Sequence, residues 1–341
     1  MHRSVIIPIL LFATLTATAE SHPDASLGRA GADLTEGRSG DSAASSPVVI
    51  APDAAAPGSL LRVATTGRPT VSRVELRDNG HRVTSARRIG VRMTGAAEIG
   101  VFLIGIDSTT VPGAYTLRGL TADDEIGFLR EIEISEREFR TEEIALDRRL
   151  TALRRDPDPA KTAESRELTE LIFSRDPDAL YHAGPLAWPL PEDSRQTSLY
   201  GDRRVFVYAD GSRARTVHMG LDLAGAPGTS VLSSGRGIVR MARSRIVTGK
   251  TVVIEHLPGV YSMYYHLDEI SVSEGVVVEQ GEQVGTLGAT GLATGPHLHW
   301  EIRVGGVAIS PVETTEHPLA ADLLPHRLLE RFERDGDEDP R

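Results

Sequence analysis

Short apolar runs separated by turn residues fill the first part of the chain. Such runs start at Leu60, Val71 and Val101, and a later run, which starts at Gly127, ends at Ile134. Apolar runs of this length between glycine, proline and asparagine turns are typical of short strands rather than helices. Residues 47–134 are therefore predicted to form a small β-sandwich.

The apolar period lengthens after this region, from about two residues to between three and four. Thr141 is predicted to cap a helix that directs Leu150 inward, and a second helix after the prolines directs Ile172 inward. The sequence between them, Asp-Pro-Asp-Pro at residues 156–159, breaks the helical pattern. Residues 135–183 are therefore predicted to form a helical hairpin that connects two domains.

The two ends of the chain have compositions that do not predict a packed core. Residues 1–19 combine Arg3 with an apolar stretch and an Ala-Thr-Ala site, which predicts a secretory signal peptide. The apolar stretch is shorter than the roughly 20 residues that a membrane span needs. Residues 20–46 are predicted to be a disordered linker and residues 316–341 an acidic tail. The expected product is exported, to the periplasm or outside the cell, with no membrane span after cleavage.

Composition and charge narrow the possible functions. The 341 residues contain 37 Lys and Arg against 48 Asp and Glu, a net charge of −11, so binding to nucleic acid is not expected. The chain has no cysteine, which excludes disulfides, thiolate metal ligands and a cysteine nucleophile. Any metal must be held by histidine and carboxylate side chains.

Histidines are concentrated between residues 184 and 315, at His218, His256, His266, His297 and His299. On a strand, alternate residues lie roughly 6.6 Å apart on one face, so the last two are predicted to point into the same cavity. His218 and Asp222 lie roughly 13 Å apart on a regular strand, so the chain must bend if both are to reach one ion. Gly220 is the residue that permits such a bend.

Three sequence blocks carry a resemblance to a known family. His218–Asp222 (HMGLD), Tyr264–Leu267 (YYHL) and Gly295–Glu301 (GPHLHWE) resemble the signature blocks of the lysostaphin/LytM-type zinc endopeptidases, which act on peptidoglycan. The resemblance extends from about Leu186 to Val312. Three blocks in order are a specific signal, whereas a lone His-x-His is weak.

The resemblance implies a site and a cofactor. It makes His218, Asp222 and His299 ligands of Zn²⁺, and it makes His266 and His297 the two unligated catalytic histidines. A metal-activated water would attack the peptide bond, with one free histidine acting as general base and the other stabilising the oxyanion. Which histidine has which role is left open by the sequence.

The resemblance also implies a fold and a substrate. The expected fold class is mainly β, with an N-terminal immunoglobulin-like sandwich, a helical hairpin, and a C-terminal antiparallel sheet that forms a LytM-type peptidase domain at residues 184–315. The expected function is a zinc metalloendopeptidase that hydrolyses peptide crosslinks of bacterial peptidoglycan. The alternative is a noncatalytic activator or binding module for cell-wall hydrolases, and no protein partner is identified.

Two residues near the motifs have ordinary interpretations. His256 is interpreted as a structural strand histidine and is not placed in the site. Tyr264 shares the predicted face of His266 and is a weak candidate for lining the substrate groove.

Overall fold

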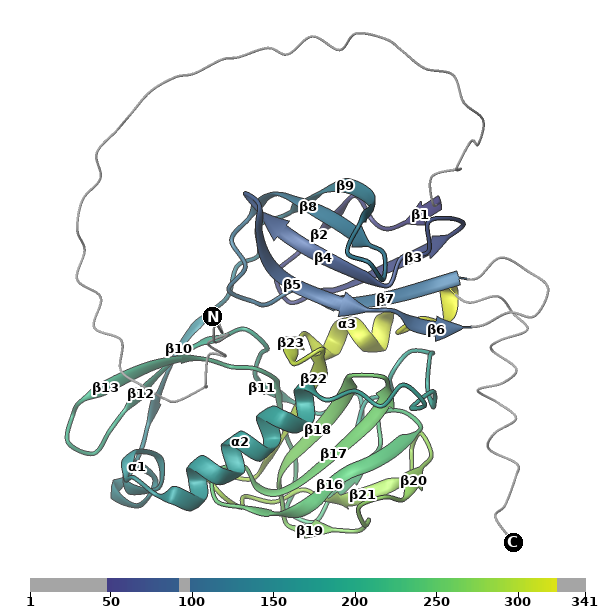
Figure 1. Ribbon diagram of the computed structural model, residues 1–341. Coiled ribbons are helices and arrows are strands. Elements are labelled where there is room, and N and C mark those ends of the chain that lie inside the picture. The colour runs from purple at the N-terminus through teal and green to yellow at the C-terminus, as the bar shows by residue number, and fades with distance from the viewer. Residues whose placement is uncertain (1–47, 92–98, 324–341) are drawn as a thin grey trace, which may run out of the picture. The chain divides into compact units, whose positions relative to one another are not determined.

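The computed structural model describes residues 48–91 and 99–323 (Figure 1). The predicted signal peptide at residues 1–19 and linker at residues 20–46 lie outside the described residues, as does most of the predicted acidic tail. Among the helices in the described ranges, none combines the length and apolar character needed to cross a membrane. The structure is mainly β, and the predicted fold class is confirmed. The immunoglobulin-like assignment of the sandwich stays a prediction.

The N-terminal region consists of two sheets. The four-stranded sheet has the order β1-β3-β7-β6, formed by β1 (Val48–Ile50), β3 (Leu60–Thr66), β7 (Ile99–Gly105) and β6 (Ile89–Val91). The five-stranded sheet has the order β2-β9-β8-β4-β5, formed by β2 (Ala54–Ala55), β9 (Ile126–Ile134), β8 (Gly113–Leu120), β4 (Arg73–Asp78) and β5 (His81–Arg87).

The two N-terminal sheets bury a common apolar core, as the predicted sandwich requires. Val63 and Phe102 of the first sheet pack in one cluster with Leu76 and Leu117 of the second. The β4–β5 hairpin turns at Asn79-Gly80, where both residues have positive φ values of 43° and 81°. This is the turn that an Asn-Gly pair favours, because its twist matches that of the strands.

The connecting region contains one strand and two helices: β10 (Thr141–Ala145), α1 (Arg148–Arg155) and α2 (Pro159–Phe173). The predicted helix start at Thr141 is wrong, because this residue begins β10. Helix α1 starts later, where the Asp147 side chain accepts a hydrogen bond from the backbone N–H of Leu150 at 2.7 Å. The predicted break and second helix are confirmed, with Asp158 capping α2.

The C-terminal region is built on an eight-stranded sheet. Its order is β11-β14-β22-β18-β17-β16-β20, and β23 pairs with β22. The strands are β11 (Gln196–Ser198), β14 (Leu221–Ala224), β22 (His297–Val304), β18 (Val260–Leu267), β17 (Gly249–Leu257), β16 (Gly237–Arg245), β20 (Val277–Val278) and β23 (Val307–Ile309).

Two three-stranded sheets, one helix and a short 3₁₀ turn complete the C-terminal region. The sheets have the orders β10-β12-β13 and β15-β21-β19. Their remaining strands are β12 (Arg203–Val207), β13 (Arg213–Val217), β15 (Ser230–Leu232), β21 (Gln283–Thr286) and β19 (Glu269–Ile270). The chain then forms α3 (Pro311–Glu316) and η1 (Ala321–Leu323).

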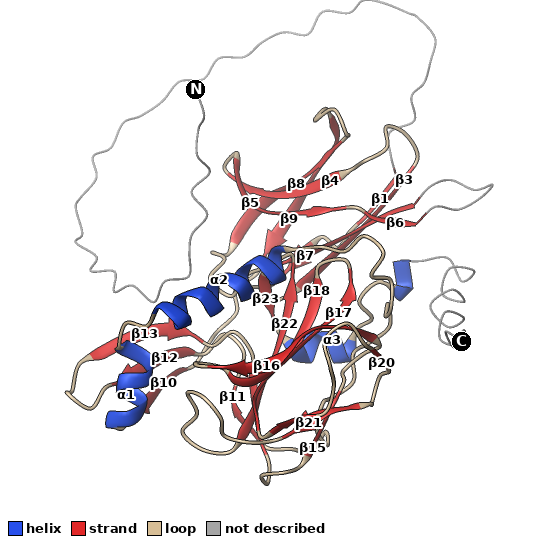
Figure 2. Ribbon diagram, turned by 60° about the horizontal axis from the view of Figure 1, so that its bottom comes forward, coloured by secondary structure: helices blue, strands red, loops and turns tan. Residues whose placement is uncertain are grey.

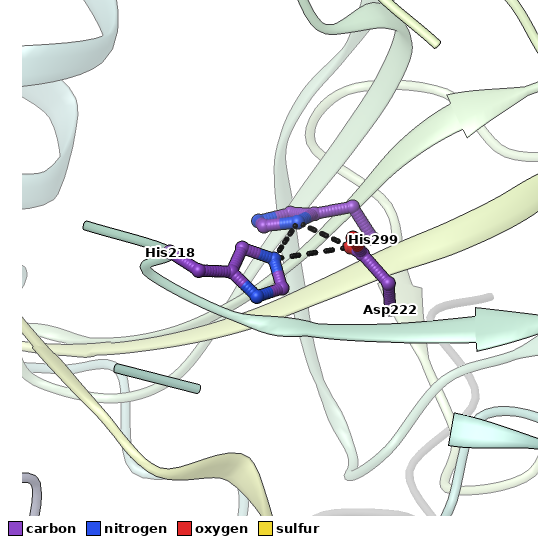
Figure 3. A group of neighbouring side chains, drawn as sticks. All are labelled: His218, Asp222 and His299. Atoms are coloured by element: carbon purple, nitrogen blue, oxygen red, sulfur yellow. Dashed lines mark hydrogen bonds and ion pairs between the residues drawn. The ribbon is translucent and has the colours of Figure 1, made fainter. Parts of the chain in front are cut away.

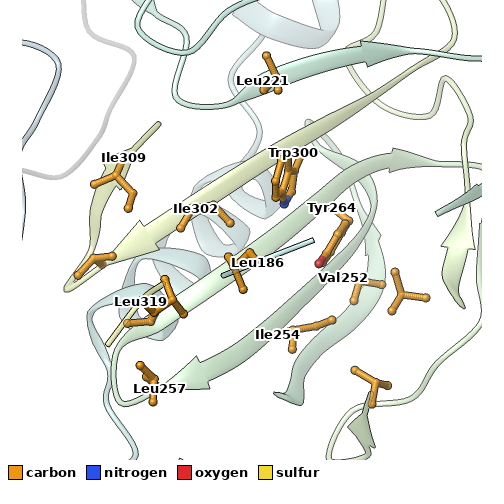
Figure 4. Close-up of a cluster of buried hydrophobic side chains, with 14 of the residues drawn as sticks. Leu186, Leu221, Val252, Ile254, Leu257, Tyr264, Trp300, Ile302, Ile309 and Leu319 are labelled. Atoms are coloured by element: carbon orange, nitrogen blue, oxygen red, sulfur yellow. The ribbon is translucent and has the colours of Figure 1, made fainter. Parts of the chain in front are cut away.

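Strand β22 has one row of side chains in the apolar core and one row on the opposite face of the large sheet. The face that carries His299 and Glu301 is called the functional face below. Leu298, Trp300 and Ile302 alternate along the strand and are fully buried in the main apolar cluster. Trp300 and Ile302 are labelled in Figure 4. His299 and Glu301 therefore point to the other face. The prediction that the two histidines of the His-x-His motif share one face, with Leu298 and Trp300 opposite, is confirmed.

Helix α2 covers part of the functional face of the large sheet, the face that carries His299 and Glu301 (Figures 1 and 2). Leu168 and Ile172 of the helix pack against Met263 and Tyr265 of β18. This apolar contact places the helix beside the functional side chains of the sheet.

The sandwich contains a buried charged residue, Glu75, whose ion pairs can be tested. Glu75 on β4 is 3% exposed in its side chain and forms ion pairs with Arg77 at 2.7 Å and Arg118 at 2.8 Å. Burial by itself would raise the pKa of Glu75, but the hydrogen bonds from Arg118 and Arg77 lower it below its ordinary value. A carboxyl group with a lowered pKa adds stability above its unfolded pKa and loses it as the pH falls.

We expect Glu75→Gln to reduce the free energy of unfolding at pH 7 by about 1–3 kcal/mol, because charged hydrogen bonds are lost. The difference from the wild type should shrink as the pH falls below 4.5, the ordinary pKa of the residue, because Glu75 is protonated first in the unfolded chain and only at a lower pH in the folded chain. Urea unfolding at several pH values measures both effects. Glu131→Gln, an exposed change on β9, serves as the control. A difference that stays constant down to pH 3 would contradict the assignment.

Candidate functional site

Three side chains from different parts of the chain converge on the functional face of the sheet (Figure 3). His218 follows β13, Asp222 lies in β14 and His299 lies in β22. Asp222 pairs directly with His299 across the antiparallel strands, so both side chains leave the sheet on the same side. The donor atoms lie close together: Asp222 Oδ1 is 2.9 Å from His299 Nδ1 and 3.1 Å from His218 Nε2, and the two nitrogens are 3.0 Å apart.

The chain bends between His218 and Asp222, as the sequence analysis predicted. Strand β13 ends at Val217 and β14 starts at Leu221. Gly220 has an additional role that was not predicted. A Cβ atom there would lie 2.5 Å from the backbone oxygen of Trp300 and 2.7 Å from Nε2 of His299. The glycine is therefore required for the close approach of the two chain segments.

Hydrogen bonds determine which atoms of His218 and Asp222 face the site. The His218 Nδ1 lies 2.8 Å from the backbone oxygen of Leu199, which can only accept, so Nδ1 carries the hydrogen and Nε2 is left with its lone pair. Burial lowers the pKa of His218. Burial would raise the pKa of Asp222, but His218 and His299 hold it well below its usual range. Asp222 is therefore ionised.

His299 is held between two carboxylates and an aromatic ring. Its Nε2 lies 3.3 Å from Glu301 Oε2, and Arg303 pairs with the same carboxylate. The Tyr265 ring stacks on the imidazole, with centroids 5.2 Å apart and planes 3° from parallel. Burial would lower the pKa of His299, but Asp222 and Glu301 raise it to about 9. These contacts fix the ring in the orientation that presents Nδ1 to Asp222 and His218.

The other two predicted site histidines lie beside this cluster. The rings of His266 and His297 have centroids 4.8 Å apart, and His297 Nε2 is 3.9 Å from Asp222 Oδ1. Each Nδ1 lies 2.8 Å from a backbone oxygen, of Thr290 for His266 and of Gly295 for His297. Both rings therefore keep Nε2 free as a proton acceptor. Burial and the neighbouring His297 and His299 lower the pKa of His266 to about 3.

The three converging donors fit a divalent metal ion. Two nitrogens and one carboxylate oxygen are the ligands that zinc takes when cysteine is absent, and a catalytic zinc site needs three protein ligands with a free position. Ligands at about 2.0–2.1 Å from a tetrahedral ion lie roughly 3.3 Å apart. The observed separations of 2.9–3.1 Å are within a few tenths of an ångström of this value.

The interpretation of Tyr264 as a groove residue is wrong. Tyr264 is fully buried in the main core, and its hydroxyl accepts a hydrogen bond from the Ser234 backbone N–H at 2.7 Å. The pairing of β17 with β18 shifts register here, and His266 has a positive φ of 61°. The strict alternation is lost, so Tyr265 and His266 both contact the site although they are adjacent in sequence.

His256 has the structural position that was expected. It is fully buried, with Nδ1 2.9 Å from the backbone oxygen of Arg236 and Nε2 2.8 Å from Ser262 Oγ. Its hydrogen bonds are to the core and none is to the five clustered site residues.

Four residues around the cluster were not found from the sequence. They are Tyr265 and Glu301, which contact His299, and Arg204 and Glu142, which form a chain of contacts to Asp222. Glu301 belongs to the third sequence block, so its spacing from His299 was a usable signal. The position of Glu142 depends on strand pairing between distant segments, and no local pattern shows it.

Comparison with known proteins identifies the region that contains the site. Residues 216–311 match the model of Peptidase family M23. A DD-carboxypeptidase/endopeptidase of Neisseria meningitidis, Mpg, is 41% identical over 96 residues, which is 28% of this chain and 22% of the relative. A peptidoglycan DD-endopeptidase of Vibrio cholerae, ShyA, is 33% identical over 145 residues, 42% of this chain and 33% of the relative. The chain thus spans a third or less of these relatives.

A solved structure resembles a larger part of the chain. A protein from Pseudomonas aeruginosa described as a peptidase M23 covers 76% of this chain and 94% of its own length, with a TM-score of 0.52 and 23% identity. This likeness supports the fold alone.

Gly220 provides a test of the site's close packing. We expect Gly220→Ala to reduce the free energy of unfolding by about 1–3 kcal/mol, because the added methyl group overlaps backbone and imidazole atoms. The displaced His299 ring should also weaken binding of added Zn²⁺. Urea unfolding and zinc titration measure the two effects.

The matched control is Gly184→Ala, whose new Cβ would make an ordinary contact of 3.5 Å with His182. Unchanged stability and zinc binding in Gly220→Ala would show that the segments around His299 are looser than the structure indicates.

Proposed function

We propose that the protein is an exported, zinc-dependent endopeptidase that hydrolyses peptide crosslinks of bacterial peptidoglycan. The match of residues 216–311 to the model of Peptidase family M23 supports the proposal. The observation that carries the proposal is the convergence of three buried donor atoms within 3.1 Å of one another, beside two histidines with free Nε2 atoms. The named activities of the relatives from Neisseria meningitidis and Vibrio cholerae support the substrate class.

His218, Asp222 and His299 would hold the metal through Nε2, Oδ1 and Nδ1. Zinc in such a site supplies Lewis acidity, which activates water and polarises a peptide carbonyl at neutral pH. The protein contributes a site in which each ligand atom already faces its neighbours. The carbonyl of Leu199 orients His218, and Glu301 orients His299.

We assign the general base to His297. Its Nδ1 hydrogen is engaged by the Gly295 carbonyl, so Nε2 can accept the proton of an attacking water molecule beside Asp222. His266 stays neutral, because burial and its neighbours lower its pKa to about 3, and its Nε2 is left to accept a hydrogen bond since its Nδ1 hydrogen is engaged by Thr290. After accepting a proton, the Nε2 of His297 can donate it to the departing amine, so this residue can move one proton through the reaction.

The proposed location follows from the N-terminal sequence and the substrate. Residues 1–19 are proposed to be a signal peptide, and peptidoglycan lies outside the inner membrane or the cell. The proposed site of action is therefore the periplasm or the exterior.

Paired substitutions separate metal binding from proton transfer. We expect His218→Ala to lose bound zinc and activity together, because a ligand is removed. His297→Ala should keep zinc but lose about 10²-fold or more in rate, because it removes only the base. Zinc content and release of fragments from purified peptidoglycan are the measurements.

The control for these substitutions is His81→Ala, an exposed histidine in the β4–β5 hairpin of the sandwich. A wild-type protein that binds zinc, cuts no peptidoglycan and stimulates a separate wall hydrolase would overturn the enzyme assignment. The result would favour the activator function instead.

Removal of the metal should also change stability. Zinc that binds only the folded chain stabilises it by about 2.7 kcal/mol at a free concentration of 100 times Kd. We therefore expect a chelator to lower the thermal midpoint of the wild type, and added zinc to restore it. The same treatment should leave the midpoint of His218→Ala unchanged, and an equal shift in that variant would place the metal elsewhere.

A further inference from the structure

Strand β10 contributes a side chain to the surroundings of the metal site, although it precedes the matched family region in the chain. We propose that Glu142 on this strand is a positioning residue that acts through Arg204 and Ser198 to orient Asp222 and His218, and so sets the affinity for the metal. The inference rests on the metal site of the proposed function.

The first path from Glu142 leads to Asp222. Strands β10 and β12 lie side by side (Figure 1). They pair in parallel, with Glu142 directly opposite Arg204. Arg204 Nε donates to Glu142 Oε1 at 2.6 Å, and its Nη2 donates to Asp222 Oδ2. Since Oδ2 is engaged in this way, Oδ1 is the oxygen that faces His218 and His299. The guanidinium thus fixes the rotation of the ligand carboxylate.

The second path leads to His218. Ser198 Oγ donates to Glu142 Oε1 at 2.6 Å and lies 3.2 Å from His218 Nδ1. Because the hydroxyl hydrogen is given to the carboxylate, the serine oxygen is free to accept from Nδ1–H, which the Leu199 carbonyl also accepts at 2.8 Å. One carboxylate oxygen therefore supports two of the three ligands.

The contacts lie where water competes weakly. The side chains of Arg204 and Asp222 are 14% and 8% exposed, and that of Glu142 is 27% exposed. Charge-assisted hydrogen bonds are strong in such surroundings. Loss of the Glu142 charge would release one side of Arg204 and leave an additional net positive charge near a divalent cation. Both changes weaken metal binding.

The neighbouring residue supplies a matched control. Glu143 follows Glu142 on the same strand and points to the other face, where it pairs with the exposed Arg213. Its side chain is 59% exposed. Glu143→Gln therefore makes the same chemical change on the same strand without touching the ligand network.

The test measures zinc affinity of the full chain by competition with a chelating dye, without any use of peptidase activity. We expect Glu142→Gln to raise the zinc Kd about 10- to 100-fold, the range typical for loss of a residue that orients a metal ligand. Glu143→Gln should stay within about twofold of the wild type. Equal affinities of Glu142→Gln and the wild type would overturn the inference.

A double-mutant cycle tests the path through Arg204. In an Arg204→Ala background, Glu142→Gln should change the zinc Kd by less than about threefold, because only the Ser198 path remains. If the fold-changes in zinc Kd of the two single variants multiply in full in the double variant, Glu142 does not act through Arg204 and the proposed path is wrong.

The thermal midpoint of the metal-free chain shows whether a variant is folded. If Glu142→Gln unfolds, Arg204→Lys takes its place, since a lysine keeps the charge but cannot bridge both carboxylates in the same way. A zinc Kd raised at least tenfold in Arg204→Lys supports the inference, and an unchanged Kd overturns it. A wild-type chain that binds no zinc defeats the proposed metal site itself, which distinguishes the two failures.

Discussion

The antiparallel register of three neighbouring strands positions the whole candidate site. Asp222 on β14 lies opposite His299 on β22, which lies opposite Tyr265 on β18. A shift of one residue in either pairing would turn His299 toward the core and Trp300 toward the site. The buried Leu298, Trp300 and Ile302 oppose such a shift, because it would expose them. Core packing on one face of the sheet therefore fixes the chemistry on the other.

Charge compensation holds the cluster in place before any ion arrives. Asp222 is contacted by Arg204 and two imidazoles, and Glu301 by Arg303 and His299. Unpaired charges are costly at this depth of burial, so each carboxylate has a cationic or hydrogen-bonding partner. The same contacts hold the ligand atoms of His218 and His299 in one orientation. Because the ligand side chains are already held in place, the free energy of metal binding is not spent on ordering them.

Support for the site comes from segments well outside the sequence motifs. Helix α2 packs Leu168 and Ile172 against β18, and the Tyr265 ring of this strand stacks on His299. Strand β10 brings Glu142 to Arg204 through a parallel pairing with β12. Helix α2 and strand β10, which connect the sandwich to the large sheet, thus contact the surroundings of the site, the helix through apolar and the strand through polar side chains. The apolar contacts give a physical reason why helix α2 and the large sheet pack together.

The sequence by itself determined the parts that depend on local spacing. The strand runs, helix α2 and the shared face of His297 and His299 all follow from periods and turn residues that a short stretch of sequence contains. The tertiary structure decided what depends on pairing between distant segments. Tyr264 lies in the core because the β17–β18 register shifts, and Thr141 begins a strand because β12 offers it hydrogen-bond partners. Register and strand pairing are set by contacts across the fold, which no local pattern of residues contains.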